Sequence, residues 1–286
     1  MVLGALKLLT TTVFMATSLR QHLLNGGRSY GPFLLSDSPV VAEMLAMIGY
    51  GHIVVDHEHS PTSIRSGQAM LQAIDAAKAY SSTKTEAIVR TPSHDPVYMK
   101  KVLDSLRLPA GVLVPMVENA EMAKQVVQST RYPLGDQSNG SLDGIRGCAA
   151  PLIRGSGWGM TPHNYVQQTR QDLLVMVQVE TPQAIDEIPE IAEVEGVDGI
   201  FIGPLDMSAS VGKMGQFQDK NVQTLIASAE EAIRSSPAFL AGFRAPGRDL
   251  KDMHDAGYQL ICGSVDLALL RQAAQDDVAS VEEFLQ

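Results

Sequence analysis

Short apolar runs rich in β-branched residues alternate along this chain with longer amphipathic segments, and this alternation constrains the fold more than any other feature. Eight runs have the character of buried strands: 33–35, 52–56, 87–90, 112–115, 174–180, 199–203, 239–242 and 259–262. Helical periodicity separates several of them, at 63–80, 95–106, 120–129 and 219–234. Because parallel strands need long crossover connections, this order predicts a parallel sheet built from β-α-β units.

Eight such strands close a (β/α)8 TIM barrel, and 286 residues are enough for one barrel-sized α/β domain. We expect an N-terminal leader or helix over residues 1–30 and a single barrel domain over 31–286. A ninth strand candidate at 144–147 leaves the strand numbering open. An open doubly wound sheet is the alternative, although no Gly-x-Gly-x-x-Gly turn follows the first strand.

Charge and cysteine content indicate which binding partners and which cellular compartment fit this chain. A formal net charge of −10 argues against nucleic acid or an anionic membrane as the main partner. No apolar run has the length of a membrane span. Cys148 and Cys262 show no zinc or disulfide spacing, which favours a reducing, cytoplasmic location. Residues 1–27 lack acidic side chains and carry Lys7 and Arg20, so they fit either a weak mitochondrial transit peptide or an N-terminal helix.

Residues 131–165 form the one long stretch with little helical or strand periodicity. It holds seven glycines, at 135, 140, 144, 147, 155, 157 and 159. Loops of this length in compact domains are usually lids, binding loops or disordered segments. We therefore expect residues 146–165 to cover the mouth of the barrel, and residues 136–143 to form a flexible surface insertion.

Polar residues recur where the apolar strands end, and this is the strongest physical sign of a functional site. They are Asp56 with His57, Glu58 and His59, then Arg90, then Gln178 and Glu180, and finally Gly203, Pro204, Leu205 and Asp206. All strands of a parallel barrel end at the same face, so these groups are expected to converge on one mouth.

Glu180 and Asp206 are the best candidate metal ligands, because hard divalent cations prefer carboxylate oxygens and a carboxylate at a buried strand end needs a partner. The alternative is that each residue only caps the helix that follows it. The chain has no lysine at the end of a strand, which disfavours a Schiff-base mechanism.

His59 and Arg90 are the candidate catalytic residues at the same strand ends. An imidazole can take and return a proton near neutral pH, which makes His59 the preferred general base. Its alternative is a loop histidine bonded to backbone. Arg90 places a permanent cation where an enolate or carboxylate oxygen could be held, and its alternative is a salt bridge that closes the barrel.

These positions resemble the HpcH/HpaI aldolase family, the class II pyruvate aldolases that act on 4-hydroxy-2-oxo acids. The resemblance runs from about Gly31 to about Gln272 and is densest in seven motifs: VDHEHSP at 55–61, VRTP at 89–92, VPMVENAE at 114–121, RYP at 131–133, GIRG at 144–147, QVETP at 178–182 and VDGIFIGPLDMS at 197–208. Seven ordered motifs are specific, whereas any one of them would be a weak signal.

The resemblance implies a barrel of the phosphoenolpyruvate/pyruvate-binding type and a homo-oligomer, a hexamer or trimer, with swapped C-terminal helices. It implies that Glu180 and Asp206 ligate Mg²⁺, Mn²⁺ or Co²⁺, which the 2-oxo acid chelates in turn. His59 would act as base through a metal-bound water, with Asp104 raising its basicity. Arg90 would steady the enolate oxygen. The pyruvate portion would be held by Gln178 and by the backbone of Gly203, Pro204 and Leu205.

Several positions depart from the family pattern and leave the substrate open. The chain has Gly51-His52 where the family usually has an Asp-Trp pair, and Leu205 where it has Ala or Ser. The segment between Asp104 and Val112 is longer, residues 136–143 look inserted, and the leader before Ser18 has no counterpart. The main alternative is an oxaloacetate decarboxylase or a decarboxylative carbon–carbon bond-forming enzyme resembling macrophomate synthase. A catalytically silent homologue is a third hypothesis.

Overall fold

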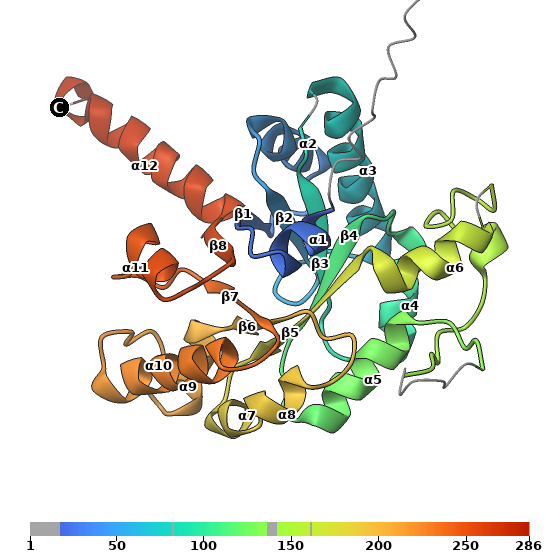
Figure 1. The fold of residues 1–286 in the computed structure, drawn as a ribbon. Coiled ribbons are helices and arrows are strands. Elements are labelled where there is room, and N and C mark those ends of the chain that lie inside the picture. The colour runs from blue at the N-terminus through green and yellow to red at the C-terminus, as the bar shows by residue number, and fades with distance from the viewer. Residues whose placement is uncertain (1–17, 82, 136–141, 161, 286) are drawn as a thin grey trace, which may run out of the picture.

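The computed structural model describes residues 18–81, 83–135, 142–160 and 162–285, and these fold into a closed barrel of eight parallel strands (Figure 1). The strands follow one another around the barrel in chain order: β1 Ser29–Leu34, β2 His52–Asp56, β3 Glu86–Arg90, β4 Ala110–Val114, β5 Leu173–Val179, β6 Gly199–Ile202, β7 Phe239–Phe243 and β8 Leu260–Val265. The expected TIM barrel is confirmed. The candidate ninth strand at 144–147 is not a strand, which settles the numbering.

Helices lie between successive strands, and most of them begin after an N-cap residue whose side chain accepts a hydrogen bond from the first turn. Their bounds are α1 Leu19–Leu24, α2 Pro39–Ile48, α3 Ile64–Ser81, α4 Pro96–Ser105, α5 Ala120–Thr130, α6 Pro162–Gln171, α7 Pro182–Asp186, α8 Ile188–Ala192, α9 Pro204–Ser210, α10 Lys220–Arg234, α11 Leu250–Asp255 and α12 Asp266–Leu285, with a short 3-10 helix, η2, at Ala150–Leu152. Side chains of Asp95, Asn119 and Asp219 accept hydrogen bonds from the first turns of α4, α5 and α10.

Strand residues alternate between two apolar cores. Val54, Ile88 and Leu113 point into the barrel, where they pack with Phe33, Phe201 and other inward side chains. Their chain neighbours point outward and pack against the helices in the larger core, as Ile53, Val55, Ala87, Val89, Val112 and Val114 do. Because successive side chains of a strand point to opposite faces, each apolar run contributes residues to both cores.

Helix α1 closes the end of the barrel at which the strands begin. Leu19 and Leu23 are buried in the interior core, and Figure 1 shows α1 lying across that end. The Leu19 backbone N–H donates to the Glu86 carboxylate at the start of β3, and Arg20 pairs with Asp198 just before β6. Helix α1, which lies within the N-terminal segment 1–30, is thus joined to the barrel, whereas residues 1–17 of the transit-peptide interpretation lie outside those described.

Helix α12 extends away from the barrel (Figure 1). At its first residue, the Asp266 carboxylate accepts hydrogen bonds from the backbone N–H groups of Leu35 and Ser36 after β1. Beyond this attachment the helix exposes large apolar side chains, namely Leu267, Leu269, Leu270, Val278, Val281 and Phe284. None of the helices in the described part of the chain has the length and hydropathy to cross a membrane.

Candidate active site

A largely buried ion pair joins the carboxyl ends of β2 and β3. Asp56 and Arg90 are partners in the parallel register of these strands. The Nε and Nη2 groups of Arg90 donate to the two carboxylate oxygens of Asp56, at 2.7 and 2.8 Å, and Asp56 is fully buried. Burial raises the pKa of Asp56, but Arg90 and the backbone N–H groups that follow Asp56 lower it by more, so the carboxylate stays charged.

Arg90 is held in one orientation by two further contacts. Its Nη1 lies 3.0 Å from Oε2 of Glu58, and its guanidinium carbon lies 4.5 Å from the centre of the Phe33 ring. The salt-bridge alternative for Arg90 is therefore present in the structure. It does not exclude a role in substrate binding, because the same contacts fix a permanent cation at the mouth.

Glu58 is the first site residue to which sequence reasoning assigned no role. Its side chain is 15% exposed and lies between the Arg90 guanidinium and the His59 ring. Burial raises the pKa of Glu58 to about 7, the charges of Asp56 and Asp206 add to this effect, and Arg90 opposes it. Its place two residues beyond the end of β2 was the only signal in the sequence.

Glu180 follows β5 directly and is buried at the mouth. Its Oε2 accepts a hydrogen bond from the Met116 backbone N–H at 3.0 Å, and its Oε1 accepts one from the Gln178 side chain. Burial raises the pKa of Glu180 to about 7, and the charges of Asp206 and Glu58 act in the same direction, against the two hydrogen bonds. The carboxylates that follow three strands, Glu58 after β2, Glu180 after β5 and Asp206 after β6, thus repel one another across the mouth.

Neither proposed metal ligand is a helix cap. Thr181 is the N-cap of α7, where its hydroxyl accepts from the Ala184 N–H, and Gly203 is the N-cap of α9. Asp206 lies in the first turn of α9 and is exposed. The capping alternative for Glu180 and Asp206 is therefore wrong, and the positive end of the α9 backbone adds a favourable environment for the Asp206 charge.

Two backbone features bring the chain close to Glu180. Met116 adopts a left-handed conformation, with φ of 54°, and its N–H points at the Glu180 carboxylate. A side chain at Gly203 would place its Cβ 2.7 Å from Oε1 of Glu180, so the Glu180 carboxylate would have to shift to admit it. Sequence reasoning missed Met116, because a backbone donor leaves no residue-type signal.

His59 lies at the rim of the mouth, with its side chain 60% exposed and its Nε2 3.8 Å from Oε1 of Glu58. Its backbone N–H donates to the Asp56 carboxylate at 3.2 Å, which ties the loop to the end of β2. The neighbouring His57 is buried instead, and its Nδ1 lies 2.9 Å from the Tyr98 hydroxyl oxygen. Of these two histidines, His59 is the one that a substrate could reach.

The mouth offers the ligand set that a hard divalent cation uses. Such cations are often held by only one or two carboxylates, with water and substrate completing the shell. Glu180 and Asp206 would supply two carboxylates, and their mutual repulsion, which raises the pKa of Glu180, is the kind that a cation relieves. The Gln178 side-chain oxygen is buried there without a hydrogen-bond partner. Among the described residues there is no cluster of three or more His, Cys, Asp or Glu side chains able to bind a metal ion.

Comparison with known proteins assigns the chain to a family. The sequence profile described as HpcH/HpaI aldolase/citrate lyase matches residues 29–273. A 4-hydroxy-2-oxo-heptane-1,7-dioate aldolase of Escherichia coli is 35% identical over 261 residues, which are 91% of this chain and 93% of that protein. A hydroxypyruvate/pyruvate aldolase of Chromohalobacter salexigens is 34% identical over 257 residues, 90% of this chain and 94% of that one.

This chain belongs to the HpcH/HpaI aldolase/citrate lyase family. Among solved structures, a family protein from Burkholderia cenocepacia superposes with a TM-score of 0.84 at 32% identity, covering 93% of this chain and 99% of that one. Macrophomate synthase superposes with a TM-score of 0.74 at 21% identity, over 93% of this chain and 91% of that one, which shows a shared fold. The predicted family and the predicted carbon–carbon lyase class are confirmed.

Asp104 does not lie beside His59 within this subunit. Helix α4 runs back from the mouth, so Asp104 near its last residue lies at the opposite end of the barrel wall. Its carboxylate accepts a hydrogen bond of 2.8 Å from Arg146, and Arg146 is buried between the rings of Tyr132 and Tyr165. Within a single chain Asp104 therefore pairs with Arg146, and its expected effect on His59 stays a prediction.

Residues 146–160 do not cover the mouth of their own barrel. The segment packs at the end of α4, where the Gly155 N–H donates to the Asp104 carbonyl oxygen and Arg154 donates to the Ser105 carbonyl oxygen. It follows α5 and leads through α6 into β5, so it belongs to the end at which strands begin. The prediction of a loop over the mouth is wrong for this subunit, and residues 136–141 of the expected insertion lie outside those described.

The chain has Gly51-His52 where the family usually has an Asp-Trp pair, and the His52 side chain fits inside the barrel. His52 is fully buried at the start of β2, and its two ring nitrogens lie 2.7 Å from the Ser29 hydroxyl and 3.5 Å from the Cys262 sulfur. Burial lowers the pKa of His52 to about 3 and raises that of Cys262 well above its ordinary value. All three groups are therefore neutral, and they fill the closed end of the barrel without touching the mouth.

Proposed function

We propose that this chain is a divalent-metal-dependent aldolase that cleaves or forms 4-hydroxy-2-oxo acids, with pyruvate and an aldehyde as the other reactants. The observation that supports this most directly is the meeting of Glu180, Asp206 and Arg90 at one mouth, where two carboxylates repel each other beside a fixed cation. The two curated relatives are named as aldolases, which supports the same reaction class.

Glu180 and Asp206 would hold the metal, for which Mg²⁺, Mn²⁺ and Co²⁺ are the candidates. When bound, the ion supplies a Lewis acid that draws electron density toward the 2-oxo group of the substrate. Hydrogen bonds from Met116 and Gln178 keep the Glu180 carboxylate facing the mouth. The proposed pocket for the pyruvate portion of the substrate is formed by the Gln178 side-chain oxygen, which has no hydrogen-bond partner, and by the backbone of Gly203, Pro204 and Leu205.

The remaining residues of the mouth would move the proton and stabilise the charge. His59 takes the proton of the C4 hydroxyl, the C3–C4 bond breaks, and its electron pair forms the pyruvate enolate. Arg90 stabilises the enolate oxygen, because its guanidinium is already oriented by Asp56 and Phe33. Return of this proton from His59 to C3 then gives pyruvate. Within one chain the carboxylate beside the His59 ring is Glu58. We therefore assign Asp104 no role toward the His59 of its own subunit.

The same proposal includes a homo-oligomer in which α12 packs on another copy. The residues Leu267, Leu270, Ala274, Val278 and Val281 recur at helical spacing along one side of α12, and all are exposed in the single chain. An apolar stripe of this length on an extended helix is the arrangement that helix packing between subunits buries.

The experiment that tests the function is exchange of the pyruvate methyl protons with deuterium, followed by NMR. Metal-stripped protein is compared with protein supplied with Mg²⁺, Mn²⁺ or Co²⁺, with Glu180→Ala, and with Glu121→Ala as a control on the exposed surface of α5. We expect exchange that depends on the metal, is lost in Glu180→Ala and is retained in Glu121→Ala, because forming the enolate requires the metal-holding carboxylate.

Absence of exchange with every metal, in protein shown to be folded by circular dichroism, would contradict the aldolase proposal. Oxaloacetate is then the next substrate to assay, since its decarboxylation passes through the same enolate and needs no proton abstraction from pyruvate. Exchange that persists in Glu180→Ala would instead move the metal site away from β5.

A further inference from the structure

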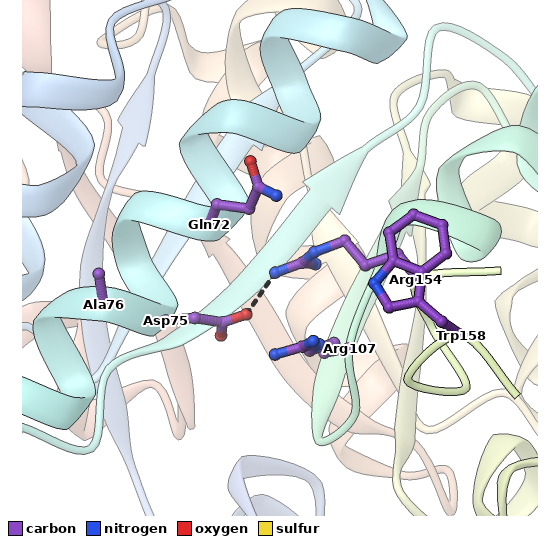
Figure 2. A pocket seen from close by; sticks show the side chains of 6 residues that line it. All are labelled: Gln72, Asp75, Ala76, Arg107, Arg154 and Trp158. Carbon is purple, nitrogen blue, oxygen red and sulfur yellow. Dashed lines mark hydrogen bonds and ion pairs between the residues drawn. The ribbon is translucent and has the colours of Figure 1, made fainter. Parts of the chain in front are cut away.

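A pocket of about 330 Å³ lies on the outer wall of the barrel, away from the mouth (Figure 2). One side is α3, and the other is the turn that carries Arg154 and Trp158 together with Arg107, which lies just beyond α4. Its lining residues are Gln72, Asp75, Ala76, Arg107, Arg154 and Trp158. The volume is within the range of pockets that bind small molecules.

The turn at 153–159 is held rigidly enough to present its side chains to this pocket. The Trp158 N–H donates to the Ile153 carbonyl oxygen at 2.8 Å, and the Gly157 N–H donates to that of Arg154 at 2.9 Å. Trp158 itself adopts φ of 60°, a left-handed conformation that is strained for a bulky residue. The residue is nevertheless 58% exposed, so the turn holds a large aromatic side chain in contact with solvent at the edge of the pocket.

The charges at the pocket are predominantly positive, in a chain whose net charge is −10. Arg154 is 4% exposed, and it donates to the Asp75 carboxylate at 2.7 Å and to the Ser105 carbonyl oxygen at 2.6 Å. Lys78 lies 3.7 Å from Asp75 and offsets that carboxylate further. Arg107 is exposed and forms no hydrogen bond or ion pair with any of the described residues, so among them its cation has no partner.

We propose that this pocket binds a small organic oxyanion, a carboxylate or a phosphate ester, at a site separate from the barrel mouth. Arg107 pairs with the anion, because a guanidinium presents two parallel donors to carboxylate or phosphate oxygens. The carbon part of the ligand lies against Trp158, which supplies a flat apolar wall. Arg154 keeps its bonds to Asp75 and Ser105 and adds positive potential from beneath.

The fluorescence of Trp158 reports on this pocket alone, since it is the only tryptophan in the chain. The full-length protein is titrated with benzoate, phenyl phosphate and acetate, with sodium chloride at matched ionic strength as the blank. We expect a saturable change with benzoate or phenyl phosphate and weaker binding of acetate, which lacks a ring. The order of benzoate and phenyl phosphate separates a carboxylate ligand from a phosphate ester.

Arg107→Gln tests the assigned anion partner, and Arg65→Gln removes the same charge from an exposed position on α3 outside the pocket. We expect benzoate affinity to fall roughly tenfold or more in Arg107→Gln and to stay unchanged in Arg65→Gln. Glu180→Ala should bind benzoate as the wild type does, which keeps this result independent of the proposed aldolase site. A fluorescence change that does not saturate, or that Arg107→Gln leaves intact, would overturn the proposal.

Discussion

Gly203 is the position at which one added methyl group is expected to damage the site most directly. In Gly203→Ala the new Cβ would come within 2.7 Å of Oε1 and 2.9 Å of Cγ of Glu180, so the carboxylate must shift. We expect Mn²⁺ affinity, measured by isothermal titration calorimetry, to fall at least about tenfold. Gly147→Ala is the control, because its Cβ would meet nothing nearer than the Lys100 side chain at 3.4 Å. Equal Mn²⁺ affinity in both variants would contradict the close approach.

Glu58 gives the metal-free protein a predictable dependence of stability on pH. Its pKa in the folded chain is about 7, above the ordinary value of 4.5. Between those values the folded protein holds a proton that the unfolded chain has released, so this contribution to stability is fully present below pH 4.5 and is lost as the pH rises through 7.

We therefore expect the free energy of unfolding to decrease less between about pH 5 and pH 8 in Glu58→Gln than in the wild type. Urea unfolding of the metal-stripped protein at the two pH values measures this difference. Glu180 contributes in the same direction in both proteins, so a residual decrease remains in the variant. Glu121→Gln on the surface of α5 serves as the control. An unchanged pH dependence in Glu58→Gln would show that the Glu58 proton is not held on folding.

At the scale of elements, α1 is expected to stabilise the barrel from its closed end. Leu23 is fully buried in the interior core, while the adjacent Leu24 is 48% exposed. Leu23→Ala should lower the free energy of unfolding by roughly 2–5 kcal/mol, because it leaves a cavity among packed side chains. Leu24→Ala should cost under about 0.5 kcal/mol. Chemical denaturation compares the two, and equal losses would mean that α1 is only loosely attached.

At the scale of the whole molecule, the apolar stripe of α12 predicts that the protein is not a monomer in solution. Leu270→Glu combined with Val278→Glu places two charges on that stripe and should reduce the mass measured by light scattering after size exclusion. Gln272→Glu on the opposite side of the helix should leave the mass unchanged. A wild-type protein that elutes as a monomer would remove the basis for subunit packing through α12.

The strands and the core of the active site were predictable from the sequence because they depend on local pattern and chain direction. Apolar runs such as 52–56 and 174–180 identify buried strands whatever surrounds them, and parallel strands end at one face. Asp56, Arg90 and Glu180 were therefore placed at one mouth, where the structure has them. The family motifs added the expected roles of these residues.

Only the tertiary structure decided which distant residues meet. The segment at 146–165 was expected at the mouth because long loops without periodicity are usually lids or binding loops, and residues 144–147 were a candidate strand. Because they are not a strand, the segment follows α5 instead and lies at the other end beside Asp104. The Met116 N–H at Glu180 and the partners of Arg154 are likewise contacts between residues far apart in the chain, and no periodicity records them.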